Sequence, residues 1–135
     1  MTLIVCVDDR LGMMFNHRRQ SRDREVIRRI LDITKGHTLW VSPYSAPLFE
    51  GAARTDAQYA QQAGKDDFCF VEDGDLPLEH ADRVILYRWN RTYPADRRFP
   101  ADPTALGFHP THTEEFVGFS HETITEEVFV KHEQA

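Results

Sequence analysis

The sequence predicts a single α/β domain in which a mostly parallel sheet is flanked by helices and finishes in a C-terminal antiparallel hairpin. Short apolar runs rich in β-branched residues alternate with helix-like segments, a spacing typical of strand–helix–strand units. The last part of the chain instead holds two strand-like runs joined by a short turn. A chain of 135 residues has room for one compact domain, which we assign to residues 1–135.

The first apolar run, residues 3–7, is too short for a stable helix and predicts a strand that is buried on both faces. Asp8 and Asp9 follow this run and mark the edge of the sheet. A polar, glycine-containing loop then continues to residue 21. Because open sheets with parallel strands bind ligands beyond the carboxyl ends of those strands, we expect chemistry in this loop first.

An amphipathic helix is predicted from residue 22 to residue 34, with Ser21 as its N-cap and Gly36 beyond its end. Asp23 falls in the first turn, where a carboxylate stabilises the helix dipole by roughly 0.3–1 kcal/mol. The other predicted elements are strands over 37–42, 68–71, 83–89, 113–119 and 123–131, helices over 43–49 and 55–63, and an extended proline-rich loop over 90–110. The last two strands are expected to form a hairpin at the edge of the sheet.

The composition limits the classes of function. A net charge of −6 argues against general electrostatic attraction to nucleic acid. No apolar run approaches membrane-spanning length and no signal peptide is recognisable, so we expect a cytoplasmic protein without a membrane partner. Cys6 and Cys69 lie inside predicted strands, where we interpret each as a small buried hydrophobic residue. The oligomeric state stays open.

Two groups of polar residues are candidates for chemistry. One is a dense run of hydrogen-bond donors before the predicted helix, where backbone N–H groups favour anions; it comprises Asn16, Arg18, Arg19, Gln20 and Ser21. The other is the set of carboxylates after the first and third strands, Asp8, Asp9, Glu72 and Asp73, which could hold Mg²⁺ or a cationic ligand if both strands end on the same side. The alternative interpretation is that strand ends are simply polar. His109 and His112, with two glutamates nearby, are weaker candidates for a metal.

The order of these motifs resembles dihydrofolate reductase, shortened in the middle. Residues 3–16 are similar to that family's first strand and glycine-bearing loop, and Asp23 falls close to its single active-site carboxylate. Residues 38–49 resemble the strand and short helix that begin the cofactor site, with Ser45 in place of the hydroxyl residue. The later strand, a Phe-Pro segment and the closing hairpin also fit. The resemblance implies a reductase-like pocket beside Asp23 for a nucleotide-like or pterin-like molecule.

The chain departs from the reductases where they bind their cofactor. Their corresponding strand ends in a double glycine, whereas residues 70–75 here contain Glu72 and Asp73, which would repel a pyrophosphate. The middle strands that flank the adenosine end are reduced to residues 51–67. These departures argue against ordinary NADPH binding, and the identity of any cofactor stays unknown.

A second resemblance covers the full length of the chain. Small bacterial proteins with a similar opening over residues 6–21, and with similar segments over 87–91 and 124–128, often carry the label ribonuclease Z. That label implies a zinc nuclease of the metallo-β-lactamase type, whose hallmark is His-x-His-x-Asp-His. The motif does not occur in this sequence, so the label conflicts with the chemistry of the chain.

The sequence therefore leaves three hypotheses and does not decide whether the protein is an enzyme. In the first, the protein binds a polar small molecule in a pocket formed by the loop before the helix together with Asp23, Ser42, Tyr44, Ser45, Glu72 and Asp73. Asp23 would then bind its ligand through both oxygens, although a purely structural role at the helix start is equally compatible with its position. The second is a metal-dependent phosphodiester hydrolase using the four carboxylates, and the third is a non-catalytic module that binds a protein or RNA partner.

Overall fold

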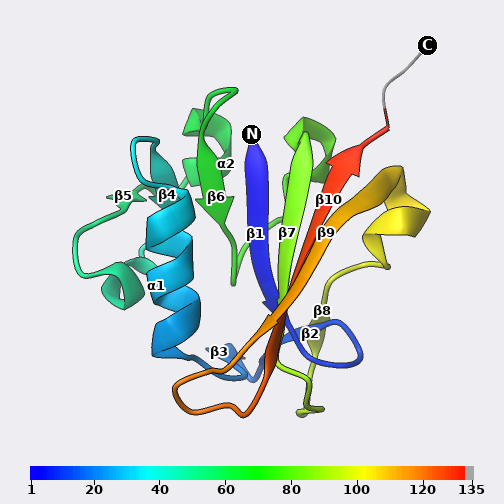
Figure 1. Cartoon of the computed structure of the whole chain (residues 1–135). Helices are drawn as coiled ribbons and strands as arrows, with labels where there is room; N and C mark the ends of the chain where they lie inside the picture. The colour runs from blue at the N-terminus through cyan, green and yellow to red at the C-terminus, as the bar shows by residue number, and fades with distance from the viewer. Residues whose placement is uncertain (133–135) are drawn as a thin grey trace.

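The computed structural model describes residues 1–132 and contains a main sheet of seven strands in the order β5-β4-β6-β1-β7-β10-β9 (Figure 1). Its strands are β1 (Thr2–Val7), β4 (Leu39–Val41), β5 (Arg54–Thr55), β6 (Phe68–Phe70), β7 (Arg83–Arg88), β9 (Phe108–Phe116) and β10 (Ile124–Lys131). Strand β1 pairs in parallel with β6 and β7, and β4 pairs in parallel with β5 and β6. Strand β10 runs antiparallel to β7 and to the edge strand β9. The prediction of a mostly parallel α/β sheet with a C-terminal antiparallel hairpin is confirmed.

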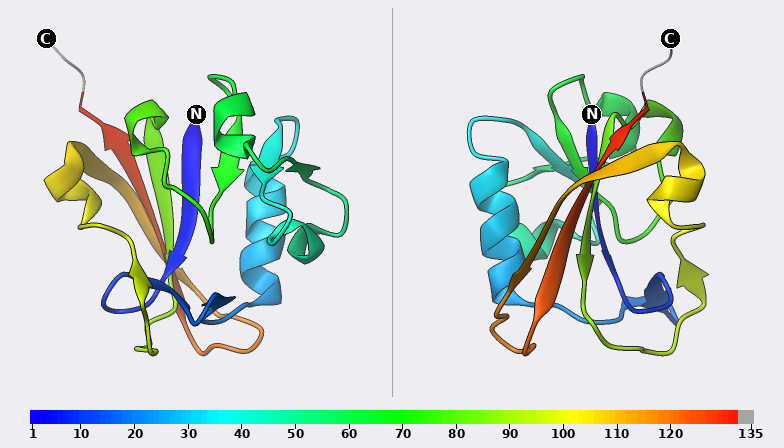
Figure 2. Two further views of the ribbon diagram at one scale, coloured as in Figure 1. Left: turned by 180° about the vertical axis from the view of Figure 1, so that it is seen from behind. Right: turned by 45° about the vertical axis from the view of Figure 1, so that its right-hand side comes forward.

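The two faces of the main sheet are covered differently (Figure 2). Helix α1 (Arg24–Ile33) lies on one face, where Val26 and Ile30 pack with Ile4 of β1. A small antiparallel sheet in the order β3-β2-β8 lies near the other face; its strands are β2 (Gly12–Phe15), β3 (Arg18–Arg19) and β8 (Arg97–Arg98). Met13 and Met14 of β2 belong to the core cluster on that side.

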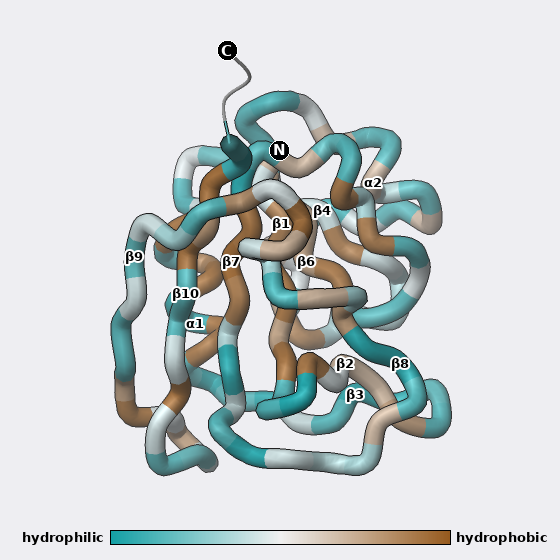
Figure 3. The backbone as a smooth tube through the Cα atoms, turned by 90° about the vertical axis from the view of Figure 1, so that its right-hand side faces the viewer, coloured by the Kyte–Doolittle hydropathy of each residue, from teal (hydrophilic) through white to brown (hydrophobic). Residues whose placement is uncertain are grey.

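Strand β1 is buried on both faces, as predicted. Leu3, Val5 and Val7 belong to the cluster beside the small sheet, whereas Ile4 belongs to the cluster beneath α1. This alternation follows from the two-residue period of a strand. The hydropathy colouring shows mostly apolar residues along β1, β6 and β7, and mostly polar ones along the edge strand β9 (Figure 3).

Helix α1 begins two residues later than predicted. Its N-cap is Asp23, which has an extended backbone and accepts a hydrogen bond from the N–H of Glu25, so the prediction of Ser21 as N-cap is wrong. The carboxylate of Asp23 thereby satisfies one free N–H group of the first turn, which is what an N-cap requires. The helix ends before Gly36, as expected, with Thr34 as its C-cap.

The chain between the main strands is less helical than predicted. The helix expected over 55–63 is only α2 (Tyr59–Gln62), because Asp56 accepts a hydrogen bond from the N–H of Gln58 in a turn and Arg54–Thr55 pair with β4 as β5. Three 3₁₀ helices complete the fold: η1 (Ala46–Phe49), η2 (Leu78–His80) and η3 (Pro103–Leu106). The predicted loop 90–110 contains β8, η3 and the start of β9. None of the helices within residues 1–132 is long and apolar enough to cross a membrane.

Candidate functional site

The carboxyl ends of the parallel strands meet the loop that precedes α1, and the turn between β9 and β10 approaches the same end of the molecule (lower part of Figure 1). This turn includes Phe119, Ser120 and His121, which no local pattern in the sequence singles out. The predicted donor run and the closing hairpin therefore come together at one end of the sheet. We therefore place the candidate functional site at this end of the sheet.

Asp23 is 3% exposed, and both of its carboxylate oxygens are fully engaged. Oδ1 accepts hydrogen bonds from the backbone N–H groups of Glu25 (2.8 Å) and Phe119 (2.9 Å). Oδ2 accepts from the N–H of Ser120 (2.8 Å) and lies 2.8 Å from Nδ1 of His121. Burial alone would raise the pKa of Asp23, but His121 and the three N–H groups together hold that pKa well below its ordinary value. Asp23 is thus an ionised carboxylate that joins α1 to the hairpin.

The hydrogen bond between Asp23 and His121 fixes the tautomer of the imidazole. An ionised carboxylate only accepts, so Nδ1 of His121 carries the hydrogen and, in the neutral ring, Nε2 is an acceptor. The hydroxyl of Ser21 lies 2.8 Å from Nε2, and in this neutral tautomer it donates to that nitrogen. Ser21, His121 and Asp23 therefore form a continuous hydrogen-bonded relay, which we call the Ser21 relay.

Aromatic side chains hold the imidazole of His121 in place. Trp89 stacks on its ring, with the centroids 4.6 Å apart and the planes inclined by 22°. The hydroxyl of Tyr93 lies 3.4 Å from Nε2, farther than the hydroxyl of Ser21. His121 is 5% exposed, so its ring is oriented by contacts on its edges and on one face.

A cavity of about 10 Å³ lies beside the relay and is lined by Cys6, Ser21, Asp23, Glu72 and Trp89, among others. This volume suffices for about one water molecule. Burial, with the charge of Glu72, raises the pKa of the Cys6 thiol well above its ordinary value. Cys6 and Cys69 are both free, as expected for hydrophobic residues of the strands.

The remaining residues of the predicted pocket form a second network that fills the space between β3, η1 and the end of β6. The guanidinium of Arg19 donates to both oxygens of Glu72, at 2.8 and 3.0 Å, and lies over the ring of Tyr44. Ser45 donates to Glu72 at 2.8 Å, and Ser42 donates to Asp73 at 2.6 Å. These residues are brought together as the sequence suggested, but they bind one another.

An open hollow of about 320 Å³ lies beside the small sheet. It is lined by Phe15, Asn16, Arg18, Arg19, Gln20, Tyr93 and Pro94, and we call it the arginine hollow. Four of its seven residues belong to the predicted donor run. Arg18 is exposed and its guanidinium makes no hydrogen bond or ion pair within residues 1–132, while Phe15 is 48% exposed. The arginine hollow thus offers a free cation beside an accessible aromatic ring.

The four carboxylates predicted as a metal site serve other purposes. Both oxygens of Asp8 are used: Oδ1 accepts from the N–H groups of Arg10 and Gly12, and Oδ2 from the amide of Gln20 and the N–H of Tyr93. Asp9 is exposed and accepts from the hydroxyl of Thr92. Glu72 and Asp73 belong to the network described above. Within residues 1–132 these carboxylates do not form a cluster with metal-ligand spacing.

The histidines of β9 keep only part of the grouping that the sequence suggested, since Glu114 lies beside His112 but His109 lies elsewhere. His112 groups with Glu114 and Glu126, whose ligand atoms all lie within 4.8 Å of one another, whereas the ring of His109 packs on that of His132. Arg29 forms ion pairs with both glutamates of the first group. A metal would have to displace this guanidinium, so the arrangement favours an ion-pair network that includes the buried Glu126.

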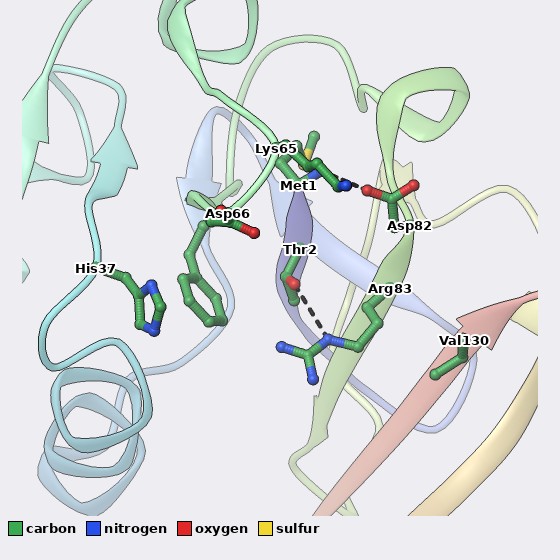
Figure 4. Close-up of a pocket in the computed structure, with 9 residues that line it drawn as sticks. Met1, Thr2, His37, Lys65, Asp66, Asp82, Arg83 and Val130 are labelled. Carbon is green, nitrogen blue, oxygen red and sulfur yellow. Dashed lines mark hydrogen bonds and ion pairs between the residues drawn. The ribbon is translucent and has the colours of Figure 1, made fainter.

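A hollow of about 350 Å³ lies at the opposite end of the sheet, where the parallel strands begin (Figure 4). The ammonium of Met1 lies 3.0 Å from Asp82 there, and Arg83 donates to the hydroxyl of Thr2. None of the predicted site residues lines it. Because parallel sheets bind ligands at the carboxyl ends of their strands, we place the candidate site at the other end.

No protein-family model matches the chain, and no curated protein matches it in sequence. The assignment of function therefore depends on the chemistry of the Ser21 relay and of the arginine hollow.

Proposed function

We propose that the protein binds a small anionic molecule with a planar ring, of nucleotide-like or pterin-like chemistry, in the arginine hollow. The observation that supports this best is the free guanidinium of Arg18 beside the exposed ring of Phe15. Guanidinium groups bind phosphates and carboxylates through two parallel hydrogen bonds, and aromatic faces stack on heterocycles. A volume of about 320 Å³ lies within the usual range of small-molecule sites.

We also propose that the fold is related to that of dihydrofolate reductase. The buried carboxylate of Asp23 at the start of the first helix and the antiparallel hairpin after a parallel sheet support this relationship. Ordinary NADPH binding is not part of the proposal, because Glu72 and Asp73 follow β6 and their charges oppose a pyrophosphate. Arg19 neutralises Glu72, but Asp73 has only the Ser42 hydroxyl as a side-chain partner within residues 1–132.

The proposal is tested by thermal shift and calorimetry with AMP, GMP, NADPH, folate and a free pterin, each with and without a chelator. We expect at least one mononucleotide or pterin to raise the melting temperature, with no effect of the chelator. Arg18→Gln should weaken binding about tenfold, or about 1.4 kcal/mol, because it removes the cation that faces the anionic group. Phe15→Leu should weaken it by removing the stacking face.

Arg28→Gln is the matched control, since Arg28 is an exposed arginine of α1 outside the arginine hollow. It should bind as the wild type does. The proposal fails if no compound of the panel binds, or if Arg18→Gln binds with unchanged affinity.

A further inference from the structure

We propose that Ser21 is a nucleophile activated by His121, and that the protein hydrolyses a carboxylic ester with a small acyl group. This inference rests on the proposed function in one respect, because we assign the alcohol part of the ester to the arginine hollow. The reacting group itself is the Ser21 relay, with hydrogen-bond distances of 2.8 Å on each side of the imidazole. A hydroxyl, an imidazole and an ionised carboxylate in this order are the arrangement that nucleophilic acyl transfer requires.

The direction of each hydrogen bond fits the reaction. The hydroxyl of Ser21 donates to Nε2 of His121, so the imidazole is placed to accept the proton as Oγ attacks. The imidazolium that forms is stabilised by Asp23, which stays ionised because the donors that bind its oxygens outweigh the effect of burial. Asp23 and Trp89 are positioning residues, which act on the reaction through the orientation of His121.

The proposed reaction has two balanced steps. Oγ of Ser21 forms a bond to the carbonyl carbon while its proton moves to Nε2 of His121, and the ester C–O bond then breaks as the leaving alkoxide takes that proton. In the second step water attacks the acyl group, His121 accepts a proton from the water, and the proton returns to Oγ as the serine ester breaks. The products are a carboxylic acid and an alcohol.

The oxyanion of each step needs a nearby N–H donor. The backbone N–H of Arg22, the residue after the nucleophile, makes no hydrogen bond within residues 1–132. In serine hydrolases of other folds the N–H after the nucleophile serves this purpose. We assign the same role to Arg22.

The surroundings define the class of substrate. The cavity beside Ser21 holds about 10 Å³, room for about one water molecule, so any acyl group must displace neighbouring side chains and a small one such as acetyl requires the least rearrangement. The arginine hollow begins at the preceding residue, Gln20, and shares Tyr93 with the relay, because the hydroxyl of Tyr93 lies 3.4 Å from Nε2 of His121. The expected substrate is therefore a short-chain ester whose alcohol carries an anionic group and a planar ring.

The test uses a fluorophosphonate probe, which reacts covalently with activated serines and needs no ligand in the arginine hollow. We expect one adduct on the folded wild-type protein, located at Ser21 by peptide mapping, and none on Ser21→Ala. His121→Gln should slow labelling about 100-fold, because it removes the general base. Thr104→Ala, which removes a hydroxyl of η3 bonded to Asp102, and His80→Gln, which removes an exposed histidine of η2, should label as the wild type does.

A second measurement uses the chromogenic esters p-nitrophenyl acetate and p-nitrophenyl octanoate. The acetate should be hydrolysed faster, with the rate lost in Ser21→Ala. The inference is overturned if the wild type forms no adduct at Ser21, or if Ser21→Ala hydrolyses the acetate within twofold of the wild type. An adduct at Ser21 without any binding in the arginine hollow would overturn the proposed function alone, and binding without an adduct would overturn the ester hydrolase alone.

Discussion

Two buried carboxylates, Asp8 and Asp23, are built alike and yet differ in what they can do. Each has both oxygens occupied by hydrogen bonds, and each lies against a glycine that leaves no room for a side chain. The donors to Asp8 are three backbone N–H groups and the amide of Gln20, none of which titrates. Asp23 has His121 among its donors, and the other nitrogen of that ring reaches Ser21.

The comparison shows that burial and a depressed pKa do not by themselves identify a functional carboxylate. The pKa of Asp8 is lowered, as that of Asp23 is, because N–H donors outweigh the effect of burial in both. What distinguishes Asp23 is a partner, the imidazole of His121, whose second nitrogen is hydrogen-bonded to Ser21. Asp8 stabilises the loop that follows β1, whereas Asp23 stabilises a helix start and also orients a base.

The largest expected effects come from removing either carboxylate. Asp8→Ala and Asp23→Ala should each lower the free energy of unfolding by about 3 kcal/mol or more, because several buried N–H groups lose their acceptor. Urea unfolding measures this loss. Fluorophosphonate labelling then separates the two, since under conditions where both variants are folded Asp23→Ala should label slowly and Asp8→Ala at the wild-type rate. Equal labelling of the two variants would mean that Asp23 does not orient the base.

Substitutions of the glycines beside the two carboxylates, Gly12 and Gly118, should have the next largest effects on stability. An added Cβ would lie 2.7 Å from Oδ2 of Asp8 at Gly12, and 2.7 Å from Oδ2 of Asp23 at Gly118. Gly12→Ala and Gly118→Ala should therefore each cost about 1–3 kcal/mol of stability by overpacking. Gly64→Ala is the control, because its nearest neighbour would lie at 3.4 Å, and it should change stability by about 0.5 kcal/mol or less. A tolerated Gly118→Ala would mean that the hairpin turn can shift away from Asp23.

Acid should weaken both carboxylate sites. An unfolded aspartate titrates near pH 3.9, roughly, and the folded pKa values of Asp8 and Asp23 lie below their ordinary value. The stability they contribute is therefore complete above about pH 4 and is lost as the pH falls through the folded pKa. Urea unfolding between neutral and acidic pH should show a shallower loss for Asp8→Asn and Asp23→Asn than for the wild type. An unchanged slope in both variants would contradict the assignment of depressed pKa values.

The smallest expected effect is that of Ser21→Ala on stability. It removes one hydrogen bond at a half-buried position, so the free energy of unfolding should fall by about 1 kcal/mol or less. Thermal unfolding measures this change. A loss of several kcal/mol would instead assign Ser21 a structural role. The Asp23 site would then be a structural site, as the Asp8 site is.

Local patterns predicted much of the fold but little of the relay. The apolar run of β1, the amphipathic period of α1 and the closing hairpin each carry their signal within a few consecutive residues. Whether Ser21 or Asp23 caps α1 could not be decided locally, since both residue types favour that position. Asp23 is held there by N–H groups of the hairpin, which lie far away in the sequence.

The same reason explains which site residues were missed. The donor run and Glu72 could be named from the residue types, but the pairing of Arg19 with Glu72 bridges 53 positions. His121 lies in a turn without any motif, and only the pairing of β9 and β10 brings it to Asp23, 98 positions away. Its stacking on Trp89 could not be inferred from either residue alone.

The long separation between Ser21 and His121, 100 positions, has a consequence for the order of folding. Contacts between distant parts of a chain close large loops and tend to form late, after local structure has condensed. During synthesis the helix start leaves the ribosome well before the hairpin turn does. A nascent or partly folded chain therefore carries Ser21 without its base, and the hydroxyl acquires its reactivity only when the last strand pair has docked.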